Sequence, residues 1–261
     1  MQRRRAIAAI VAVVPLAVTA MVVRQRRETL PVPGPVSAVT APPRPAPPSA
    51  GEAGSDTPVT PGATEDGPGE APEVATSTVT MICRDALGLL PAIAGGVVHE
   101  PLRVTVHHSA FLIEDAADAP GQLRAFQRDH QRRGWVDVAY HRAVDPAGNV
   151  YELRDPAVEG DSGTAYDTTG HLQLLCLGDY DQQEPTPVLL ETLARLVAAE
   201  CAARGLPLAT LSAHRDHVLT WCPGGALYAR LEEVRARAEE LLTAGAPVLR
   251  PLCGDEGSAR V

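Results

Sequence analysis

The sequence predicts an α/β domain in which helices flank a central mixed β-sheet, preceded by an N-terminal hydrophobic helix and a disordered linker. Three observations support this fold class. Short β-branched or apolar runs alternate with longer stretches of helical periodicity after residue 80. Turn-forming residues separate the two kinds of segment. Strands and helices in mixed order are typical of a sheet covered by helices.

Composition divides the 261-residue chain into four parts. We expect a signal-anchor or signal segment at 1–29, a Pro/Gly/Ala-rich linker at 30–80, a folded domain at 81–245 and a C-terminal tail at 246–261. Roughly 165 residues are enough for one domain with its own core. The formal net charge of −9 lies almost wholly in the folded part. Because nucleic-acid binding needs stripes of Lys and Arg, this acidity excludes nucleic acid as a partner.

The N-terminal segment predicts attachment to, or passage across, a membrane. Ala6 to Val23 is an uncharged apolar run of 18 residues that follows three arginines. As a helix it spans ~27 Å, close to the hydrocarbon thickness of a bilayer. The arginines that follow it favour an uncleaved anchor, whereas Val18-Thr19-Ala20 fits a signal-peptide cleavage site. Either outcome predicts a domain in the cell envelope, outside the cytoplasm. The linker cannot bury a core and is expected to be disordered.

The first half of the domain predicts two strands, a helix and a hairpin. A strand is expected at 102–107 and a helix at 122–133, where apolar residues recur at helical spacing and Gly134 marks the end. Strands at 140–144 and 150–153 flank Asp145-Pro146-Ala147-Gly148-Asn149, a sequence that favours a hairpin turn.

The second half predicts a buried strand between a polar loop and two helices. The loop at 160–170 contains small polar residues, and 172–177 is nearly all apolar, as expected of a central strand buried on both faces. A helix is expected at 186–203, opened by prolines and ended by Gly205. A last amphipathic helix is expected at 226–242.

Two histidines and one cysteine form a candidate zinc site. His107 lies at the end of the first strand, while His214 and Cys222 lie eight residues apart in one later segment. Two imidazoles and a thiolate are a zinc ligand set that leaves a fourth position for water, the arrangement of catalytic zinc. Neighbouring residues of a strand face opposite ways, so only one of His107 and His108 can point into the site.

Other residues are candidates for the remaining chemistry. An oxyanion and a proton must be handled by a second group, for which Tyr140 and Thr220 are the candidates. Asp216 or a backbone carbonyl is expected to orient one imidazole. Taken singly, a His-His pair is more often structural, and a buried Cys is more often a core residue than a ligand. The ligands together with Tyr140 and Thr220 favour the zinc hydrolase.

The ordered motifs of the chain resemble those of a known family, the type 2 N-acetylmuramoyl-L-alanine amidases, which include the peptidoglycan recognition proteins and phage T7 lysozyme. The resemblance runs from about residue 82 to 240. The motifs are Ile82-Cys83-Arg84-Asp85-Ala86-Leu87-Gly88, His107-His108-Ser109-Ala110, Gly134-Trp135-Val136-Asp137-Val138-Ala139-Tyr140-His141, Val150-Tyr151-Glu152-Leu153-Arg154, His214-Arg215-Asp216 and Thr220-Trp221-Cys222-Pro223-Gly224. The first motif has Leu87 where the family usually has Trp.

The resemblance implies a function for these residues. Zinc is expected on His107, His214 and Cys222, with Tyr140 and Thr220 assisting hydrolysis of the amide between N-acetylmuramic acid and L-alanine in peptidoglycan. Many members carry a His in the loop where this chain has Gly160-Asp161-Ser162-Gly163, so its stem-peptide preference is open. Candidate substrate contacts are His108, Arg154, Ser162 and His171. For Arg154 a structural salt bridge is an equal alternative.

The remaining expectations concern the cysteines, the oligomeric state and the alternative functions. Cys83 and Cys201 are a candidate disulfide that pins the opening segment to the long helix, with Cys176 a core thiol and Cys253 in the tail. The domain is expected to be monomeric. Two alternatives to the peptidoglycan amidase stay open: a peptidoglycan-binding receptor without catalysis, and a zinc amidase that cuts a different amide. The retained Cys222 favours an enzyme, because non-catalytic relatives typically lose that ligand.

Overall fold

The computed structural model describes residues 77–261. The expected membrane segment at 1–29 and almost all of the expected linker lie outside these residues. Within 77–261, no helix combines the length and the apolar character needed to cross a bilayer. The start of the folded part is earlier than expected, because residues 78–80 belong to the first strand.

A seven-stranded mixed sheet forms the centre of the domain, in the order β6-β2-β5-β3-β4-β1-β7. Only β3 and β4 pair antiparallel, as the expected hairpin; the other neighbours are parallel. The predicted mixed sheet is thereby confirmed. The strands are β1 (Thr78–Ile82), β2 (Arg103–His108), β3 (Arg142–Val144), β4 (Val150–Glu152), β5 (His171–Cys176), β6 (Ser212–Ala213) and β7 (Val248–Leu252).

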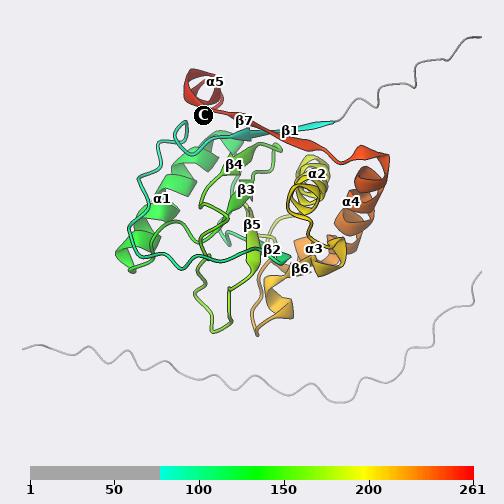
Figure 1. The fold of residues 1–261 in the computed structure, drawn as a ribbon, viewed down its shortest axis with the longest axis horizontal. Coiled ribbons are helices and arrows are strands. Elements are labelled where there is room, and N and C mark those ends of the chain that lie inside the picture. The colour runs from blue at the N-terminus through cyan, green and yellow to red at the C-terminus, as the bar shows by residue number, and fades with distance from the viewer. Residues whose placement is uncertain (1–76) are drawn as a thin grey trace, which may run out of the picture. The chain divides into compact units, whose positions relative to one another are not determined.

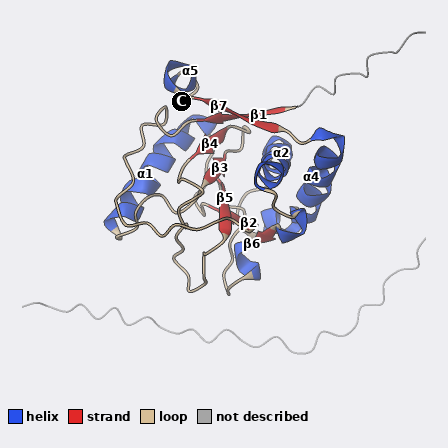
Figure 2. Ribbon diagram, in the orientation of Figure 1, coloured by secondary structure: helices blue, strands red, loops and turns tan. Residues whose placement is uncertain are grey.

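Helices cover both faces of the sheet. Helix α1 lies on one side, and α2 and α4 pack together on the other (Figure 1), with loops covering much of the α1 side (Figure 2). The helices are α1 (Ala119–Arg132), α2 (Pro187–Arg204), α3 (Gly225–Ala229), α4 (Leu231–Gly245) and α5 (Gly254–Ser258), with short 3-10 helices at Ala116–Asp118, Leu208–Thr210 and His214–Asp216.

Local sequence signals explain where α2 begins and ends. The Thr186 hydroxyl accepts a hydrogen bond from the Leu189 amide, Pro187 occupies the first helical position, and Gly205 ends the helix in the left-handed conformation with φ of 66°. The helix expected at 226–242 is instead two helices, since the chain turns at Arg230 between α3 and α4.

The side chains of β2 alternate between the two faces, as the pleat requires. Val104 and Val106 pack into the apolar cluster beneath α2 and α4. Thr105 and His107 therefore face the α1 side. We call the α2/α4 side the packing face and the α1 side the site face. Strand β5 is buried along its whole length, as its apolar sequence predicted.

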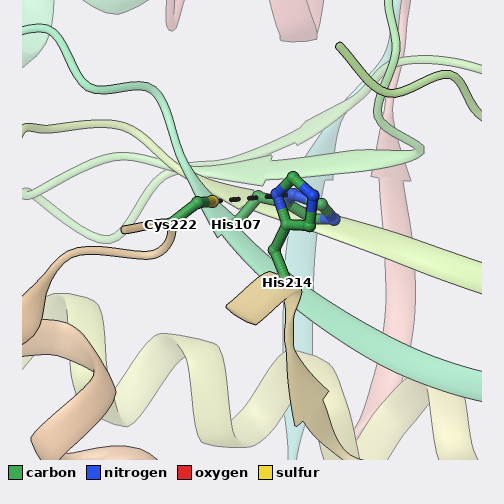
Figure 3. Close-up of side chains that lie close together, drawn as sticks. All are labelled: His107, His214 and Cys222. Atoms are coloured by element: carbon green, nitrogen blue, oxygen red, sulfur yellow. Dashed lines mark hydrogen bonds between the residues drawn. The ribbon is translucent and has the colours of Figure 1, made fainter. Parts of the chain in front are cut away.

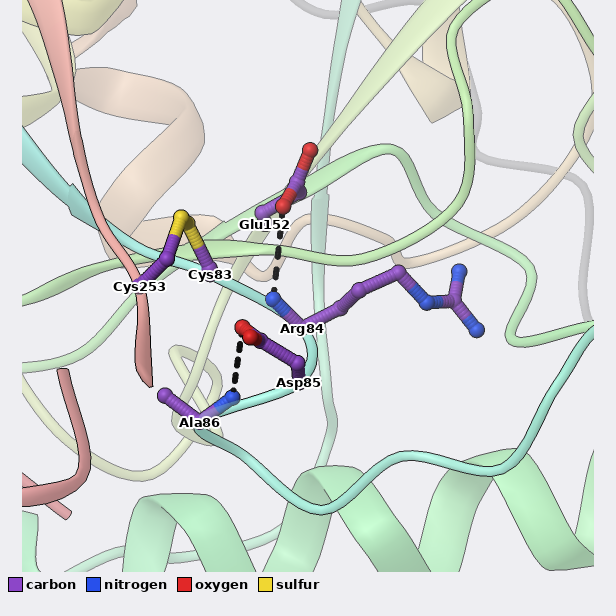
Figure 4. The surroundings of a disulfide bond; sticks show 6 residues. All are labelled: Cys83, Arg84, Asp85, Ala86, Glu152 and Cys253. Carbon is purple, nitrogen blue, oxygen red and sulfur yellow. Dashed lines mark hydrogen bonds between the residues drawn. A yellow bond between two sulfur atoms is a disulfide. The ribbon is translucent and has the colours of Figure 1, made fainter. Parts of the chain in front are cut away.

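The C-terminal segment is part of the fold, which corrects two expectations. Residues 246–261, expected as a tail, supply β7 and α5. Strand β7 pairs with β1 in register, with Ile82 beside Leu252. The next residue of each strand, Cys83 and Cys253, therefore meets its partner in a disulfide with a Cα–Cα distance of 4.9 Å (Figure 4). The expected Cys83–Cys201 bond was wrong, because Cys201 is buried in the packing-face cluster as a free thiol.

Candidate metal centre

Strand pairing brings the two histidines together. Val106 of β2 lies beside Ala213 of β6 in a parallel register. The residues that follow are His107 and His214, whose ring centroids lie 4.7 Å apart. Both imidazoles are buried, at 2% and 6% exposure. The expectation that only one residue of the His-His pair faces the site is met, since His108 packs against Tyr180 on the packing face.

The loop after His214 folds back and delivers Cys222 to the same place. The Arg215 amide donates to the Cys222 carbonyl at 3.0 Å, closing the loop. The Cys222 Sγ then lies 3.7 Å from His107 Nδ1 and accepts a hydrogen bond from the His108 amide at 3.4 Å. Figure 3 shows the three side chains converging from β2 and from the two ends of this loop.

The ligand atoms fit a tetrahedral zinc ion. One atom from each of His107, His214 and Cys222 lies within 4.8 Å of the other two. Zinc bonds of about 2.3 Å to sulfur and about 2.1 Å to nitrogen, at a tetrahedral angle, place the two ligand atoms about 3.6 Å apart. The Sγ–Nδ1 distance of 3.7 Å matches that edge. Imidazole and thiolate donors also suit zinc better than magnesium or calcium.

Burial sets the protonation of the three ligands. It lowers the pKa of His107 well below the ordinary value, with His214 adding to the effect, and lowers the pKa of His214 to about 4. Burial raises the pKa of the Cys222 thiol to about 12, against the opposing hydrogen bond from the His108 amide. At neutral pH the site thus offers two neutral imidazoles and a thiol that a metal must deprotonate.

Hydroxyl groups contact the outer nitrogens of both imidazoles. Thr164 Oγ1 lies 2.7 Å from His214 Nε2, and the Tyr166 hydroxyl lies 3.4 Å from His107 Nε2. The carboxylate of Asp216, one of two candidates for this role, instead accepts hydrogen bonds from the Ala213 amide and the Tyr228 hydroxyl at 2.7 and 2.8 Å. It shapes the loop and contacts neither ligand imidazole.

Tyr140 stands beside the ligands, and Thr220 supports one of them. The Tyr140 ring lies 5.3 Å from that of His107 and 6.3 Å from that of His130. Burial raises the pKa of Tyr140 above its ordinary value, so its hydroxyl keeps its proton. The Thr220 hydroxyl accepts a hydrogen bond from the Cys222 amide at 3.3 Å. His130 stays neutral, since burial lowers its pKa to about 4.

Three of the four expected substrate contacts are buried inside the protein. His108 accepts a hydrogen bond from the Tyr180 amide at 3.4 Å, and His171 Nδ1 lies 2.7 Å from Thr105 Oγ1. Arg154 is 2% exposed; its guanidinium donates to three backbone carbonyls and forms an ion pair of 2.5 Å with Asp161. This is the structural salt bridge that the sequence left open. Ser162 is half-buried, 3.5 Å from His214 Nε2.

Two cavities flank the residues that surround the metal centre. The first, which we call the helix cavity, measures about 550 Å³. Its lining comes from α1 and the segments beside it: Ser109, Phe111, Gln122, Ala125, Phe126, Asp129, His130, Arg132, Arg133 and Tyr140. The second, the loop cavity, measures about 300 Å³ and includes Ser162 and Tyr166 in its lining. Tyr140 and Tyr166, each next to His107, thus open onto different cavities.

Sequence reasoning missed Thr164, Tyr166 and Trp221. The first two are one Thr and one Tyr in a loop of small polar residues, and no spacing rule links them to histidines 50 and 59 residues away. Trp221 lies directly before Cys222 and is 75% exposed. Its position directly before a predicted ligand was the one signal in the sequence, because its exposure is known only from the structure.

Comparison with known proteins places this geometry in a family. Residues 98–225 match the family Amidase_2, described as N-acetylmuramoyl-L-alanine amidase. A human N-acetylmuramoyl-L-alanine amidase is 34% identical over 47% of this chain and 22% of its own length, so the chain spans about a fifth of that relative. Peptidoglycan recognition protein 1 of the mouse is 28% identical over 59% of this chain and 87% of its own length.

Solved structures agree with this assignment. Drosophila PGRP-LB, a peptidoglycan recognition protein, has a TM-score of 0.53 with 25% identity, over 58% of this chain and 92% of that one. The matched region contains β2 to β6, the lining of the helix cavity, most of the lining of the loop cavity and all three residues of the candidate metal centre. Residues 98–225 therefore form an Amidase_2 domain.

Proposed function

We propose that the domain is a zinc-dependent amidase that hydrolyses the bond between N-acetylmuramic acid and L-alanine in peptidoglycan. One observation carries the proposal: His107, His214 and Cys222 present their ligand atoms within 4.8 Å of one another, with Tyr140 beside them. The names of the relatives support peptidoglycan as the substrate. A chain kept only for binding would not need an intact thiolate ligand.

The ligands would hold zinc in a site with one open position. When bound there, zinc acidifies a water molecule and polarises the carbonyl of the amide. The neutral imidazoles of His107 and His214 leave the net charge of the site low, and Cys222 contributes one negative charge after losing its proton. Thr220 holds the Cys222 amide, which keeps the sulfur pointing at the histidines.

Tyr140 is the residue best placed to stabilise the transition state. Its phenol stays protonated because burial raises its pKa, so it can donate a hydrogen bond to an oxygen that gains negative charge. It also lines the helix cavity, which brings its hydroxyl to a surface that substrate can reach. A protonated donor in a site with little water stabilises the transition state most, because negative charge develops there.

The two cavities suit a substrate with two arms. The scissile amide joins a sugar to a peptide, so the sugar and the peptide must extend from the metal centre in different directions. The helix cavity contains aromatic and charged side chains, among them Phe126, Asp129 and Arg133, and the loop cavity is bounded by Trp135, Ser162 and Tyr166. We propose that the sugar and the peptide of the substrate each occupy one of these two cavities.

The same proposal includes the setting of the domain. Peptidoglycan lies outside the cytoplasmic membrane, so residues 1–29 would act as anchor or signal and 30–76 as a spacer to the domain. The zinc domain then comprises the described residues, with β7 and α5 as integral parts. The Cys83–Cys253 disulfide is consistent with an oxidising compartment.

Digestion of purified peptidoglycan tests the function. The full chain, or residues 77–261 once shown to fold, is incubated with peptidoglycan with and without a chelator. Release of new L-alanine N-termini that stops with chelator and returns with added zinc is the expected result. Zinc loading and peptidoglycan binding without release would identify a recognition protein instead. Release that a chelator does not affect would refute the metal mechanism.

A further inference from the structure

One loop supplies the hydroxyl groups that meet both ligand imidazoles. Thr164 and Tyr166 lie two residues apart between β4 and β5, yet they contact histidines on β2 and after β6. Thr164 Oγ1 lies 2.7 Å from His214 Nε2, a full hydrogen-bond distance, and the Tyr166 hydroxyl lies 3.4 Å from His107 Nε2. Neither contact is needed to build the sheet.

These contacts use one ring nitrogen of each histidine and leave the other nitrogen for a metal. His107 directs Nδ1 at the Cys222 sulfur, so Nε2 is its outer nitrogen. His214 directs Nε2 at Thr164, which leaves Nδ1 for the metal. An imidazole that gives one lone pair to a metal carries its proton on the other nitrogen. Each Nε2–H would then donate to a hydroxyl oxygen of the loop.

The loop is fixed well enough to hold those hydroxyls in place. The Tyr166 ring packs 4.8 Å from the His214 ring and stacks on His217 at 5.7 Å with an interplanar angle of 15°. The Thr164 amide donates to Ser162 Oγ at 3.1 Å. At the base of the loop, Thr168 Oγ1 donates to the Gly160 carbonyl at 2.9 Å, and Arg154 bonds Asp161.

We propose that Thr164 and Tyr166 are positioning residues that fix the rings of His214 and His107 and thereby tighten metal binding. Because Tyr166 also lines the loop cavity, a ligand in that cavity touches a residue that holds a metal ligand. The inference rests on the proposed zinc centre but not on amidase activity.

Zinc affinity is the decisive measurement. The dissociation constant is measured by competition with a chromophoric chelator for wild type, Thr164→Val and Tyr166→Phe. Loss of an outer-shell partner of a metal-binding His typically weakens affinity about 10- to 100-fold. We expect that range for Thr164→Val, and a smaller effect, about threefold to tenfold, for Tyr166→Phe because its contact is longer. Thr164→Ser keeps the hydroxyl and should restore affinity.

Control variants distinguish the loss of a positioning contact from a general loss of structure. Thr169→Val removes a hydroxyl of the same loop that donates to Glu159 and contacts neither ligand imidazole, so it should leave zinc affinity unchanged. Melting curves of the metal-free variants should match wild type within a few degrees. In the cobalt-substituted protein, the visible bands that report ligand geometry should shift for Thr164→Val and return for Thr164→Ser.

Each outcome bears on a different proposal. Unchanged zinc affinity and an unchanged cobalt spectrum in Thr164→Val and Tyr166→Phe would overturn the positioning role and leave the amidase proposal intact. Weakened affinity in Thr164→Val without rescue by Thr164→Ser would also overturn it. Zinc binding by wild type without cleavage of peptidoglycan would overturn the amidase only. Failure of wild type to bind zinc would overturn both.

Discussion

The two faces of the central sheet bury side chains for different purposes. On the packing face, α2 and α4 cover a large continuous apolar cluster that includes Val104, Leu174 and Leu193. On the site face, the apolar cluster around Leu123 and Leu175 is smaller. Much of that side is buried polar groups, among them Thr105, His107, Asp137, His141, Arg154, His171 and His214. Adjacent residues of the same strand, such as Val106 and His107, serve opposite faces.

The residues that stabilise the fold and the residues of the candidate site therefore lie mainly on opposite faces of the sheet. Buried apolar area is the main source of folding free energy, so the packing face carries most of it. Buried polar groups on the site face contribute less net stability, but their hydrogen bonds fix the direction of each donor and acceptor. Substitutions on the two faces should therefore change different measurable quantities.

The largest expected contrast is between two cysteines. Cys222→Ser removes the thiolate ligand on the site face and should abolish turnover and weaken zinc binding by more than about 100-fold. Cys201→Ala, on the packing face, should cost about 1 kcal/mol of stability and leave turnover unchanged. Digestion assays and chelator competition on both variants test the contrast. Full activity of Cys222→Ser would remove Cys222 from the site.

A core truncation should show the reverse pattern. Leu193 is a fully buried residue of α2, so Leu193→Ala should lower the free energy of unfolding by about 2–5 kcal/mol. Urea unfolding measures this, and zinc affinity of the folded fraction should stay at the wild-type value. Leu90→Ala, at a side chain 49% exposed, is the matched control and should change stability by less than about 0.5 kcal/mol. A large loss of zinc affinity in Leu193→Ala would show that the faces are coupled.

Two tyrosines sharpen the comparison further. Tyr140→Phe should lower kcat by about 100-fold or more and leave zinc affinity within a factor of about three, since only the hydroxyl is lost. Tyr180→Phe deletes a packing-face hydroxyl that donates to the Leu177 carbonyl, and should cost about 1 kcal/mol of stability with little change in kcat. If Tyr140→Phe instead loses metal, the residue is structural.

The last expected effect is a pH dependence of zinc binding. The pKa of Cys222 is raised to about 12 and that of His214 is lowered to about 4, so between pH 5 and 8 the metal-free site holds one proton that zinc must displace. Affinity should rise about tenfold for each pH unit, because release of one proton is favoured as pH rises. Competition measurements at pH 5.5, 6.5 and 7.5 test the slope. A flat profile would mean that the thiolate forms without metal.

Local signals allowed much of the fold to be predicted. The turn at 145–149 and its hairpin, the cap and end of α2, and the buried β5 follow from residues close together in sequence. The convergence of His107, His214 and Cys222 was also predictable, because few residue types bind zinc and these three form a zinc-type donor set. The expected helix divides into α3 and α4 at Arg230. Because Arg is not a helix-breaking residue, the sequence did not predict this division.

The features that could not be predicted depend on contacts between residues far apart in the sequence. Strands β1 and β7 lie at opposite ends of the described chain, and nothing in either local sequence indicates that they pair. Only that register places Cys83 beside Cys253, so no cysteine count could identify the disulfide. The contacts of Thr164 and Tyr166 likewise exist only after the loop closes over β2 and β6.

The position of the β1–β7 pair has a mechanical consequence. The chain enters the domain at Ser77, directly before β1, and three strands separate β1 from β2 in the sheet. A pull transmitted along the preceding chain would act first on β1 and on its pairing with β4 and β7. The sulfur bridge at the far end of that strand pair would share the load. Force at the point of entry would thus act first on this side of the sheet, and the candidate zinc ligands would keep their spacing.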